Sequence, residues 1–251
     1  MILLAGIYYP EGCIVNFSVN QSMITTVIFD LDDTLYDELQ YCKSGFRAVA
    51  ESLVEKKGAS FDAERIFETL NEQFRSGDRT KIFNAALERL NIGYDRQLIA
   101  ELVRVYRNHR PQINLPQDAG TTLEKLSKDY RLAMLTDGFM PAQRLKVEAL
   151  KIARYFECII YTEELGREYW KPSQTGFKRL LEKMQITADS AAYIADNVEK
   201  DFIAPNSLRM MTVQIIRAER IRPASVPCKP EAAPRHIIKT LTQLTELLGS
   251  A

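Results

Sequence analysis

The residues best suited to chemistry in this chain form a short acidic run directly after an apolar segment. Asp30, Asp32 and Asp33 follow the sequence Val-Ile-Phe at positions 27–29, and only Leu31 separates the first two. Carboxylates this close repel one another, and burial beside apolar side chains adds a desolvation cost. Such a cluster usually persists because a cation neutralises it. We expect that cation to be Mg²⁺.

The spacing of Asp30 and Asp32 also suits catalysis. Side chains alternate along an extended strand, so both carboxylates can face one pocket while Leu31 turns away. One carboxylate could attack a phosphorus atom and form an aspartyl-phosphate, while the other transfers protons to the leaving oxygen and from water. A solvated acidic turn is the alternative for an isolated Asp-x-Asp, and the preceding strand and following Thr-Leu argue against it.

Residues 30–35 resemble the first motif of the haloacid dehalogenase (HAD) superfamily. That motif is a strand followed by Asp-x-Asp-x-Thr-Leu, which this chain matches in full, and three further motifs follow in the family's order. The resemblance covers residues 23–248 and points to the phosphatase branch. It implies that Asp30 is the catalytic nucleophile and that Asp32 is the catalytic acid and base.

The second motif supplies a phosphate cradle in the family. An apolar segment at 132–135 runs into Thr136, Asp137 and Gly138. By resemblance, the Thr136 hydroxyl and the backbone N–H groups of Asp137 and Gly138 bind the phosphate. Gly138 lets the chain turn tightly there, because it has no side chain in the way.

The third motif supplies a catalytic lysine. Lys171 precedes a proline and a helix predicted over 174–184. The resemblance implies that its ammonium binds the phosphate and offsets the charge shared by Asp30 and the transferring group. A lone lysine is usually a solvated surface residue, so the motif order carries this assignment.

The fourth motif completes the metal site that the resemblance implies. An apolar segment at 192–194 runs into Ala195 and Asp196, and Asp201 follows. The expected Mg²⁺ ligands are Asp30, Asp196 and the main-chain carbonyl of Asp32, with Asp201 supporting the metal shell or orienting the lysine. The family usually has glycine at position 195. An alanine there would be strained only if the backbone required a positive φ.

The remaining pattern predicts the fold class. Strand-like segments alternate with helical patterns, which is typical of an α/β, doubly wound (Rossmann-like) parallel sheet. The expected strands are at 25–29, 132–135, 158–161, 192–194 and 212–216. Functional residues should gather at the carboxyl ends of these strands, where each motif lies.

An inserted segment divides this fold in the sequence. Residues 38–110 have helical apolar spacing throughout and predict an all-helical domain. The family resemblance makes it a C1-type cap that closes over the site and selects small-molecule substrates. The core domain would then comprise 23–37 and 111–251.

The cap contains no motif that fixes substrate contacts. The candidates are four basic residues, each of which is otherwise a solvated helix charge: Arg47, Arg75, Arg79 and Lys81. The solvated charge is the favoured interpretation for each of them, and the basic loop at 75–79 resembles an anion-sensing turn.

Both ends of the chain carry weaker signals. The partly apolar segment 1–10 makes a poor signal peptide and is too short for a membrane span, so we interpret residues 1–22 as a disordered extension or an upstream mis-start. The proline-rich segment 222–230 predicts an extended surface loop. Residues 236–248 have helical apolar spacing and predict one helix packed on the sheet.

Composition limits the partners. The chain has 251 residues with 33 Lys+Arg and 33 Asp+Glu, so no global field attracts nucleic acid or an anionic membrane. Four cysteines without metal-type spacing favour reduced thiols in the cytoplasm. We expect a monomer or weak homodimer that acts on a small phosphorylated metabolite.

The leading function hypothesis is a Mg²⁺-dependent phosphatase that hydrolyses a nucleotide, sugar phosphate or phosphoglycolate-like acid. A dehalogenase of the same superfamily lacks the second motif-one acid and needs no metal, so Asp32 and Asp196 argue against it. A phosphomutase keeps all four motifs and stays open as an alternative. A non-catalytic binding or regulatory module on this fold is the third alternative, suggested only by Ala195.

Overall fold

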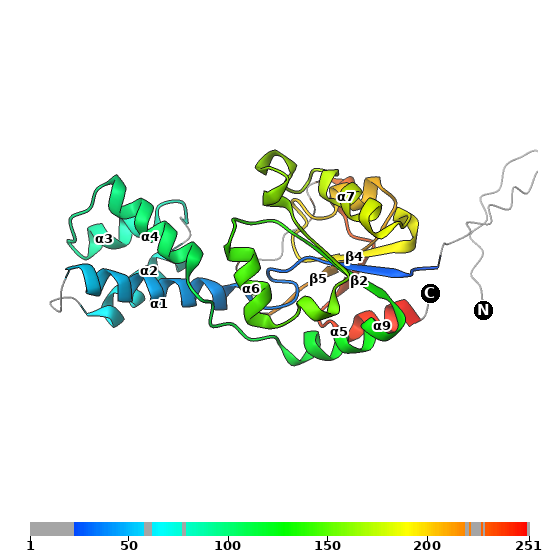
Figure 1. The fold of residues 1–251 in the computed structure, drawn as a ribbon, viewed down its shortest axis with the longest axis horizontal. Coiled ribbons are helices and arrows are strands. Elements are labelled where there is room, and N and C mark those ends of the chain that lie inside the picture. The colour runs from blue at the N-terminus through cyan, green and yellow to red at the C-terminus, as the bar shows by residue number, and fades with distance from the viewer. Residues whose placement is uncertain are drawn as a thin grey trace, which may run out of the picture.

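The computed structural model describes residues 23–57, 62–76, 79–218, 221, 227 and 229–249. The prediction for residues 1–22 lies outside the described residues, as does most of the predicted loop at 222–230. The described chain forms a parallel sheet covered by helices, with a group of four helices beside it (Figure 1).

Six parallel strands form the sheet in the order β3-β2-β1-β4-β5-β6. They are β1 (Thr26–Phe29), β2 (Arg131–Thr136), β3 (Cys158–Tyr161), β4 (Ala191–Ala195), β5 (Met211–Ile215) and β6 (His236–Ile238). β2 and then β3 lie on one side of β1, and β4, β5 and β6 follow one another on its other side. The prediction of a doubly wound α/β sheet is confirmed.

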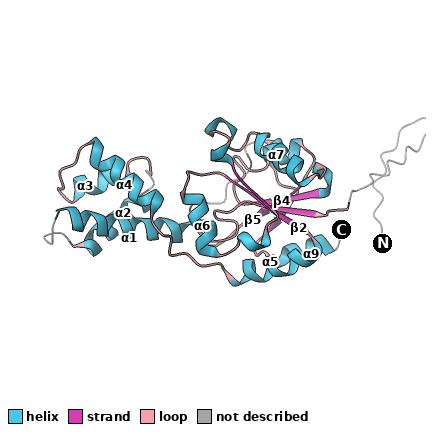
Figure 2. Ribbon diagram, viewed as in Figure 1, coloured by secondary structure: helices cyan, strands magenta, loops and turns pink. Residues whose placement is uncertain are grey.

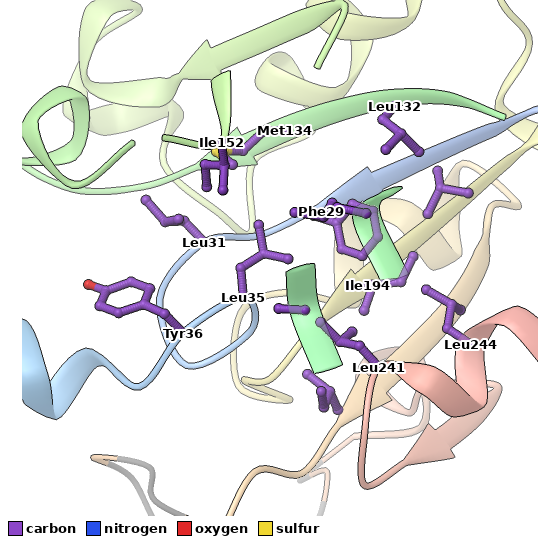
Figure 3. Packing of buried hydrophobic residues seen from close by; sticks show 14 of the residues in the cluster. Phe29, Leu31, Leu35, Tyr36, Leu132, Met134, Ile152, Ile194, Leu241 and Leu244 are labelled. Carbon is purple, nitrogen blue, oxygen red and sulfur yellow. The ribbon is translucent and has the colours of Figure 1, made fainter. Parts of the chain in front are cut away.

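The strands lie at the centre of the sheet domain with helices around them (Figure 2), and every residue of β1, β4 and β5 is buried. In β1, Val27 and Phe29 pack into one hydrophobic cluster and Ile28 into the other. A strand buried on both faces reads as a continuous apolar run, as residues 27–29 do. Figure 3 shows Phe29 with Leu132 and Ile194 from the strands on either side of it.

Helices cover both faces of the sheet. α5 (Gln117–Asp129) and α9 (Thr242–Gly249) cover one face, and α7 (Thr175–Met184) with α8 (Ile203–Ser207) covers the other. α6 (Ala142–Leu150) lies between the sheet and the group of four helices. Short 3₁₀ turns complete the connections at Ala153–Tyr155, Thr162–Glu164, Arg167–Tyr169, Ala188–Ser190 and Pro230–Ala232.

The inserted segment folds into four helices, which we call the helical lobe. They are α1 (Glu38–Lys57), α2 (Ala63–Arg75), α3 (Ile82–Arg89) and α4 (Arg96–Asn108). Aspartates start two of them: the Asp62 side chain accepts from Glu64 N–H and Asp95 accepts from Leu98 N–H, as N-cap residues do. The lobe has its own hydrophobic core, which includes Phe46.

The tail differs from its prediction as a single helix over 236–248. Its first three residues form β6, and the helix begins only at Thr242. Ile237 is 61% exposed whereas its neighbour Ile238 is 6% exposed and pairs with Ile215. Adjacent apolar residues that point to opposite sides fit a strand, so the helical spacing at the start of this segment was misleading.

The loop after β1 is anchored by Asp33. Its backbone is left-handed, with φ 52°, a conformation that aspartate tolerates better than most residues. Its Oδ1 accepts from Glu38 N–H and its Oδ2 from Ile221 N–H, each at 2.9 Å. Asp33 therefore fixes the start of α1 rather than facing a ligand with a free carboxylate.

Among the described residues, no helix combines the length and apolarity needed to cross a bilayer.

Candidate active site

A cavity of about 380 Å³ lies where the carboxyl ends of the central strands meet the helical lobe. The core contributes mainly polar and charged residues: Asp30, Asp32, Asp33, Asp137, Gly138, Phe139, Ala142, Gln143, Lys146, Trp170, Asp196, Asn197 and Lys200. The lobe contributes Glu38, Tyr41, Val103, Tyr106 and Arg107. The strand order reverses around β1 at this point, which is where ligands bind in open α/β sheets.

Lys171 holds two of the predicted acidic residues together. Its Nζ lies 2.7 Å from Asp30 Oδ1 and 2.8 Å from Asp201 Oδ1, and it donates to the Tyr193 hydroxyl at 3.0 Å. The side chain is buried, and an ammonium is stable there only because these oxygens replace its water. The predicted role of Asp201 in orienting the lysine agrees with this contact.

Three carboxylates converge beside that lysine. Oxygen atoms of Asp30, Asp196 and Asp201 lie within 4.8 Å of one another. Burial raises the pKa of Asp30 to about 6 against the opposing effect of Lys171. Burial, followed by the charges of Asp201 and Asp30, raises the pKa of Asp196 well above its usual range.

This arrangement fits a divalent cation. Three carboxyl groups adjoin the single ammonium of Lys171, and repulsion from Asp201 and Asp30 adds to the effect of burial in raising the pKa of Asp196. Oxygen donors in a compact group are the ligands that Mg²⁺ prefers. The residues predicted to hold the metal through side chains, Asp30 and Asp196, therefore lie together, with Asp201 beside them.

Asp32 lies on the same cavity but has different partners. Its Oδ1 accepts from Lys146 Nζ at 2.7 Å and from the Tyr36 hydroxyl at 2.5 Å, and its Oδ2 accepts from Gln143 Nε2 at 2.9 Å. Burial alone would raise the pKa of Asp32, but Lys146 and these hydrogen bonds hold it below its usual value. Its carboxylate is separate from the three-carboxylate group.

The segment 136–138 is packed tightly against α6. Thr136 Oγ1 accepts from Gln143 Nε2 at 2.8 Å, and Gly138 has φ 145°. A Cβ on Gly138 would lie 2.7 Å from Gln143 Cδ, so glycine is needed for both conformation and space. The Asp137 carboxylate accepts from the Thr162 hydroxyl at 2.7 Å, which leaves its backbone N–H as the part suited to an anion.

Ala195 causes no backbone strain. It is buried at the end of β4, and it is not among the described non-glycine residues with positive φ. The methyl group therefore fits where the family usually has glycine, and the sequence-based reason for doubting activity does not apply.

The four basic lobe residues predicted to contact substrate do not line this cavity in the described structure. Arg47 pairs with Glu64 on the surface, and Arg79 donates to the Ile221 carbonyl at 3.0 Å. Arg75 and Lys81 are exposed. The lobe instead presents Arg107, whose guanidinium carbon lies 3.5 Å from the centroid of the Phe139 ring.

Sequence reasoning missed Gln143, Lys146, Arg107 and Lys200. Gln143 and Lys146 lie three positions apart and so share one face of α6. That face is buried, but polar residues at such spacing are typical of an exposed face. The sequence offers no local signal that distinguishes the two cases.

A doubly wound sheet with an aspartate, a lysine and further carboxylates at its carboxyl edge defines an α/β enzyme with a charged catalytic site. A family model described as haloacid dehalogenase-like hydrolase matches residues 27–215. The chain belongs to this family, which confirms the resemblance seen in the motifs, and it is a hydrolase.

Characterised relatives cover most of the chain. A glyceraldehyde 3-phosphate phosphatase of Methanocaldococcus jannaschii is 28% identical over 201 residues, which span 78% of this chain and 87% of the relative. A ribulose-1,5-bisphosphate 5-phosphatase of Halopiger xanaduensis is 28% identical over 243 residues, spanning 90% and 100%. The structure of a 2-haloacid dehalogenase from Pseudomonas syringae superposes with a TM-score of 0.62 at 26% identity, covering 91% and 99%.

Proposed function

We propose that this chain is a Mg²⁺-dependent phosphatase that hydrolyses a small phosphorylated metabolite through an aspartyl-phosphate on Asp30. The observation that carries the proposal is the environment of Asp30. Its carboxylate contacts the Lys171 ammonium and adjoins the carboxylates of Asp196 and Asp201 in a cavity of substrate size. Two phosphatases among the relatives support the same reaction.

Substrate binding would rely on donors at the edge of the sheet. The Thr136 hydroxyl, the backbone N–H groups of Asp137 and Gly138, and the Lys171 ammonium would bind the phosphoryl oxygens. These groups are held rigidly, Thr136 by Gln143 and Lys171 by Asp201. Donors fixed in advance stabilise the charge of the transition state without having to reorganise.

In the first step, an Asp30 oxygen would attack phosphorus, and the bond between phosphorus and the ester oxygen would break. The electron pair of that bond goes to the leaving oxygen, which would take a proton from Asp32, because the negative charge of the bound phosphoryl group favours the acid form of this carboxyl group. The products of this step are a free alcohol and an acyl phosphate on Asp30.

In the second step, Asp32 would take a proton from water as the water oxygen attacks phosphorus. The bond between phosphorus and Asp30 breaks, which releases inorganic phosphate and restores both carboxyl groups. Mg²⁺, held by Asp30, Asp196 and the main-chain carbonyl of Asp32, would supply charge stabilisation at the phosphoryl oxygens in both steps.

The helical lobe would act as the cap over this reaction, with residues 38–110 as the cap domain and 23–37 with 111–251 as the core. Tyr41, Tyr106 and Arg107 from the lobe line the same cavity as Asp30. Closing the lobe over bound substrate would exclude water until the second step.

A dehalogenase is the competing reaction within the family, given the similar 2-haloacid dehalogenase structure. A halide leaves as a stable anion and needs no proton, whereas an alkoxide does. The carboxylate of Asp32 and the carboxylate group around Asp196 therefore favour phosphate ester hydrolysis.

The direct test is release of inorganic phosphate from p-nitrophenyl phosphate and from a panel of phosphorylated sugars and acids, with Mg²⁺ and with a chelator. We expect Mg²⁺-dependent release to water and no halide release from 2-chloropropionate. Return of the phosphoryl group to the substrate would indicate a phosphomutase. No turnover with any divalent metal would refute the proposal and favour a binding module.

A further inference from the structure

Two polar residues on α6 are buried where a helix normally buries apolar ones. Gln143 and Lys146 lie among the buried residues of α6 with Ala142, Val147 and Leu150. The Lys146 side chain is only 5% exposed. Burying an ammonium is costly unless oxygens replace its water, so its partners explain why it is there.

Those partners centre on Asp32. Lys146 Nζ lies 2.7 Å from Asp32 Oδ1, 3.9 Å from Glu38 Oε1 and 4.1 Å from the centroid of the Tyr41 ring. Gln143 Nε2 donates to Asp32 Oδ2 at 2.9 Å. Each carboxylate oxygen of Asp32 thus has its own donor on one face of one helix.

Gln143 also connects Asp32 to the predicted phosphate cradle. Its Nε2 lies 2.8 Å from both Thr136 Oγ1 and the Asp137 carbonyl oxygen. An amide nitrogen carries two hydrogens, so these three acceptors share them. Gln143 therefore sets the spacing between Asp32 and Thr136.

We propose that Lys146 and Gln143 are positioning residues that fix the Asp32 carboxylate for proton transfer to the leaving oxygen. This inference rests on the proposed phosphatase function. Rotation of Asp32 away from α6 would give up two hydrogen bonds, one of them charge-assisted. Tyr36, the other donor to Asp32, belongs to the same loop as Asp32 and cannot by itself fix the position of that loop. The donors on α6 belong to a different element and can hold the Asp32 carboxylate in place relative to the rest of the core.

The position of Lys146 agrees with this role better than with direct phosphate binding. Its ammonium is already within ion-pair distance of Asp32 and Glu38, whereas Lys171 contacts Asp30, the predicted nucleophile. A lysine that served the phosphoryl group would affect every substrate equally. A lysine that acts through Asp32 would affect only substrates whose leaving oxygen needs a proton.

Leaving-group dependence separates these roles. We would measure kcat/KM, which reports the steps up to alcohol release, for p-nitrophenyl phosphate and for glycerol 1-phosphate. Nitrophenolate leaves without a proton, whereas the glycerol alkoxide requires one. The variants are Lys146→Met and Gln143→Leu, with Asp32→Asn as the reference for complete loss of the acid.

We expect Lys146→Met to lower kcat/KM for glycerol 1-phosphate about 10- to 100-fold, a part of what a general acid contributes. The loss for p-nitrophenyl phosphate should stay within about threefold, so the effect depends on the leaving group. Gln143→Leu should act in the same direction. Lys146→Arg keeps a cation that can contact Asp32 and should recover most of the rate.

The matched control is Arg144→Met, which changes a charged residue on the exposed side of the same helix. It should leave both substrates unaffected. Equal losses for both substrates in folded Lys146→Met would overturn the inference while leaving the phosphatase function in place. If that variant does not fold, the same comparison on Gln143→Leu decides, because this variant also removes a donor to Asp32. A wild-type chain that releases no phosphate from either ester would refute the proposed function itself, and the inference with it.

Discussion

Lys171 Nζ lies 2.7 Å from Asp30 Oδ1 although 141 positions separate the two residues in the chain. Asp30 follows the central strand β1, and Lys171 precedes α7, which covers one face of the sheet. Neither residue would be buried without the other, because each charge offsets the desolvation of its partner. Folding of the sheet domain and assembly of the site therefore depend on the same contact.

Replacement of Asp30 by asparagine tests the nucleophile. An amide of nearly the same shape cannot form the acyl phosphate, so Asp30→Asn should lower kcat at least about 10³-fold. The fold should persist, because the substitution keeps the volume of the side chain and Asp201 still offsets the charge of Lys171. Phosphate release and thermal unfolding should be measured on the same preparation, with Asp129→Asn on the core surface as control. A near-normal rate in a folded Asp30→Asn would show that another group attacks phosphorus.

Loss of Lys171 should damage stability as well as turnover. Lys171→Ala leaves Asp30 and Asp201 buried without their cation, and breaking a buried pair in this way costs about 3–5 kcal/mol. Activity should fall about 10²- to 10³-fold, as for loss of an electrostatic stabiliser of the transition state. Urea unfolding monitored by circular dichroism measures the first effect. Lys178→Ala, on the exposed side of α7, is the control and should change neither stability nor activity. An unchanged unfolding midpoint for Lys171→Ala would contradict the buried contact between Lys171 and the two aspartates.

Metal removal should affect stability without any substrate present. Mg²⁺ that binds only the folded chain raises the free energy of unfolding by about 2.7 kcal/mol at a hundredfold excess over its dissociation constant. We expect a chelator to lower the thermal midpoint and Mg²⁺ to restore it. Asp196→Asn should reduce this response, because it removes one of three converging carboxylates. A midpoint that does not depend on Mg²⁺ would mean that these carboxylates do not bind it.

His109 should make stability depend on pH. Its Nδ1 donates to the Tyr106 carbonyl oxygen at 2.6 Å, while Nε2 is buried without a partner. Burial lowers the pKa of His109 below its ordinary value of 6.5. As pH falls, the unfolded chain therefore protonates at His109 before the folded chain does. The contribution of neutral His109 to the free energy of unfolding is fully present above about pH 6.5 and decreases as pH falls below that value.

His109→Gln should remove this contribution to the pH slope. Urea unfolding at several pH values between 5 and 8, a range that spans the titration of an ordinary histidine, measures the slope. His236→Gln, at the other histidine of the chain, is the matched control. A slope that is the same in His109→Gln and in the wild type would assign the acid sensitivity to other groups.

Arg107 should influence which phosphate esters are accepted. Within the described part of the chain no carboxylate lies within ion-pair distance of Arg107. The two lysines on the same cavity are paired, Lys146 with Asp32 and Lys200 with Asp137. Burial and the nearby Arg167 lower the pKa of Arg107. A second anionic group on a substrate would therefore be attracted to the Arg107 guanidinium and would stabilise its charge. For a bisphosphate ester that the wild-type chain hydrolyses, Arg107→Gln should lower kcat/KM about 10- to 100-fold.

An ester with a single phosphate group and no other anionic group, also hydrolysed by the wild-type chain, provides the comparison for Arg107→Gln. Its kcat/KM should change by less than about threefold. Arg104→Gln, on the exposed side of α4, is the control variant. Equal losses for both substrates would assign Arg107 to packing against Phe139 rather than to recognition.

The sequence predicted the parts of this molecule that are encoded locally. β1 and the acidic residues after it form one continuous segment, and Lys171 precedes a helix that begins at Thr175, one residue after its predicted start. The apolar spacing of residues 38–110 likewise predicted the helices of the lobe. These features depend on neighbouring residues, so a single sequence is enough to find them.

The rest depends on contacts between distant segments. Nothing near Lys146 in the sequence shows that its helix turns this residue toward Asp32, 114 positions away. The tail was misjudged for a similar reason, since only pairing with β5 makes a strand of residues 236–238. Arg79 looked like an anion-binding residue, but its guanidinium binds the carbonyl of Ile221, a residue that is far from it in sequence.

Ile221 connects the two halves of the molecule. Its N–H is bound by Asp33, next to the predicted acid, and its carbonyl oxygen is bound by Arg79 of the inserted helices. Through Ile221 the inserted segment is thus tied to the core at a point away from its two chain crossings. A swing of these helices would pull on the same aspartate loop to which we assign the chemistry, so in the proposed enzyme substrate admission and catalytic alignment would be mechanically linked.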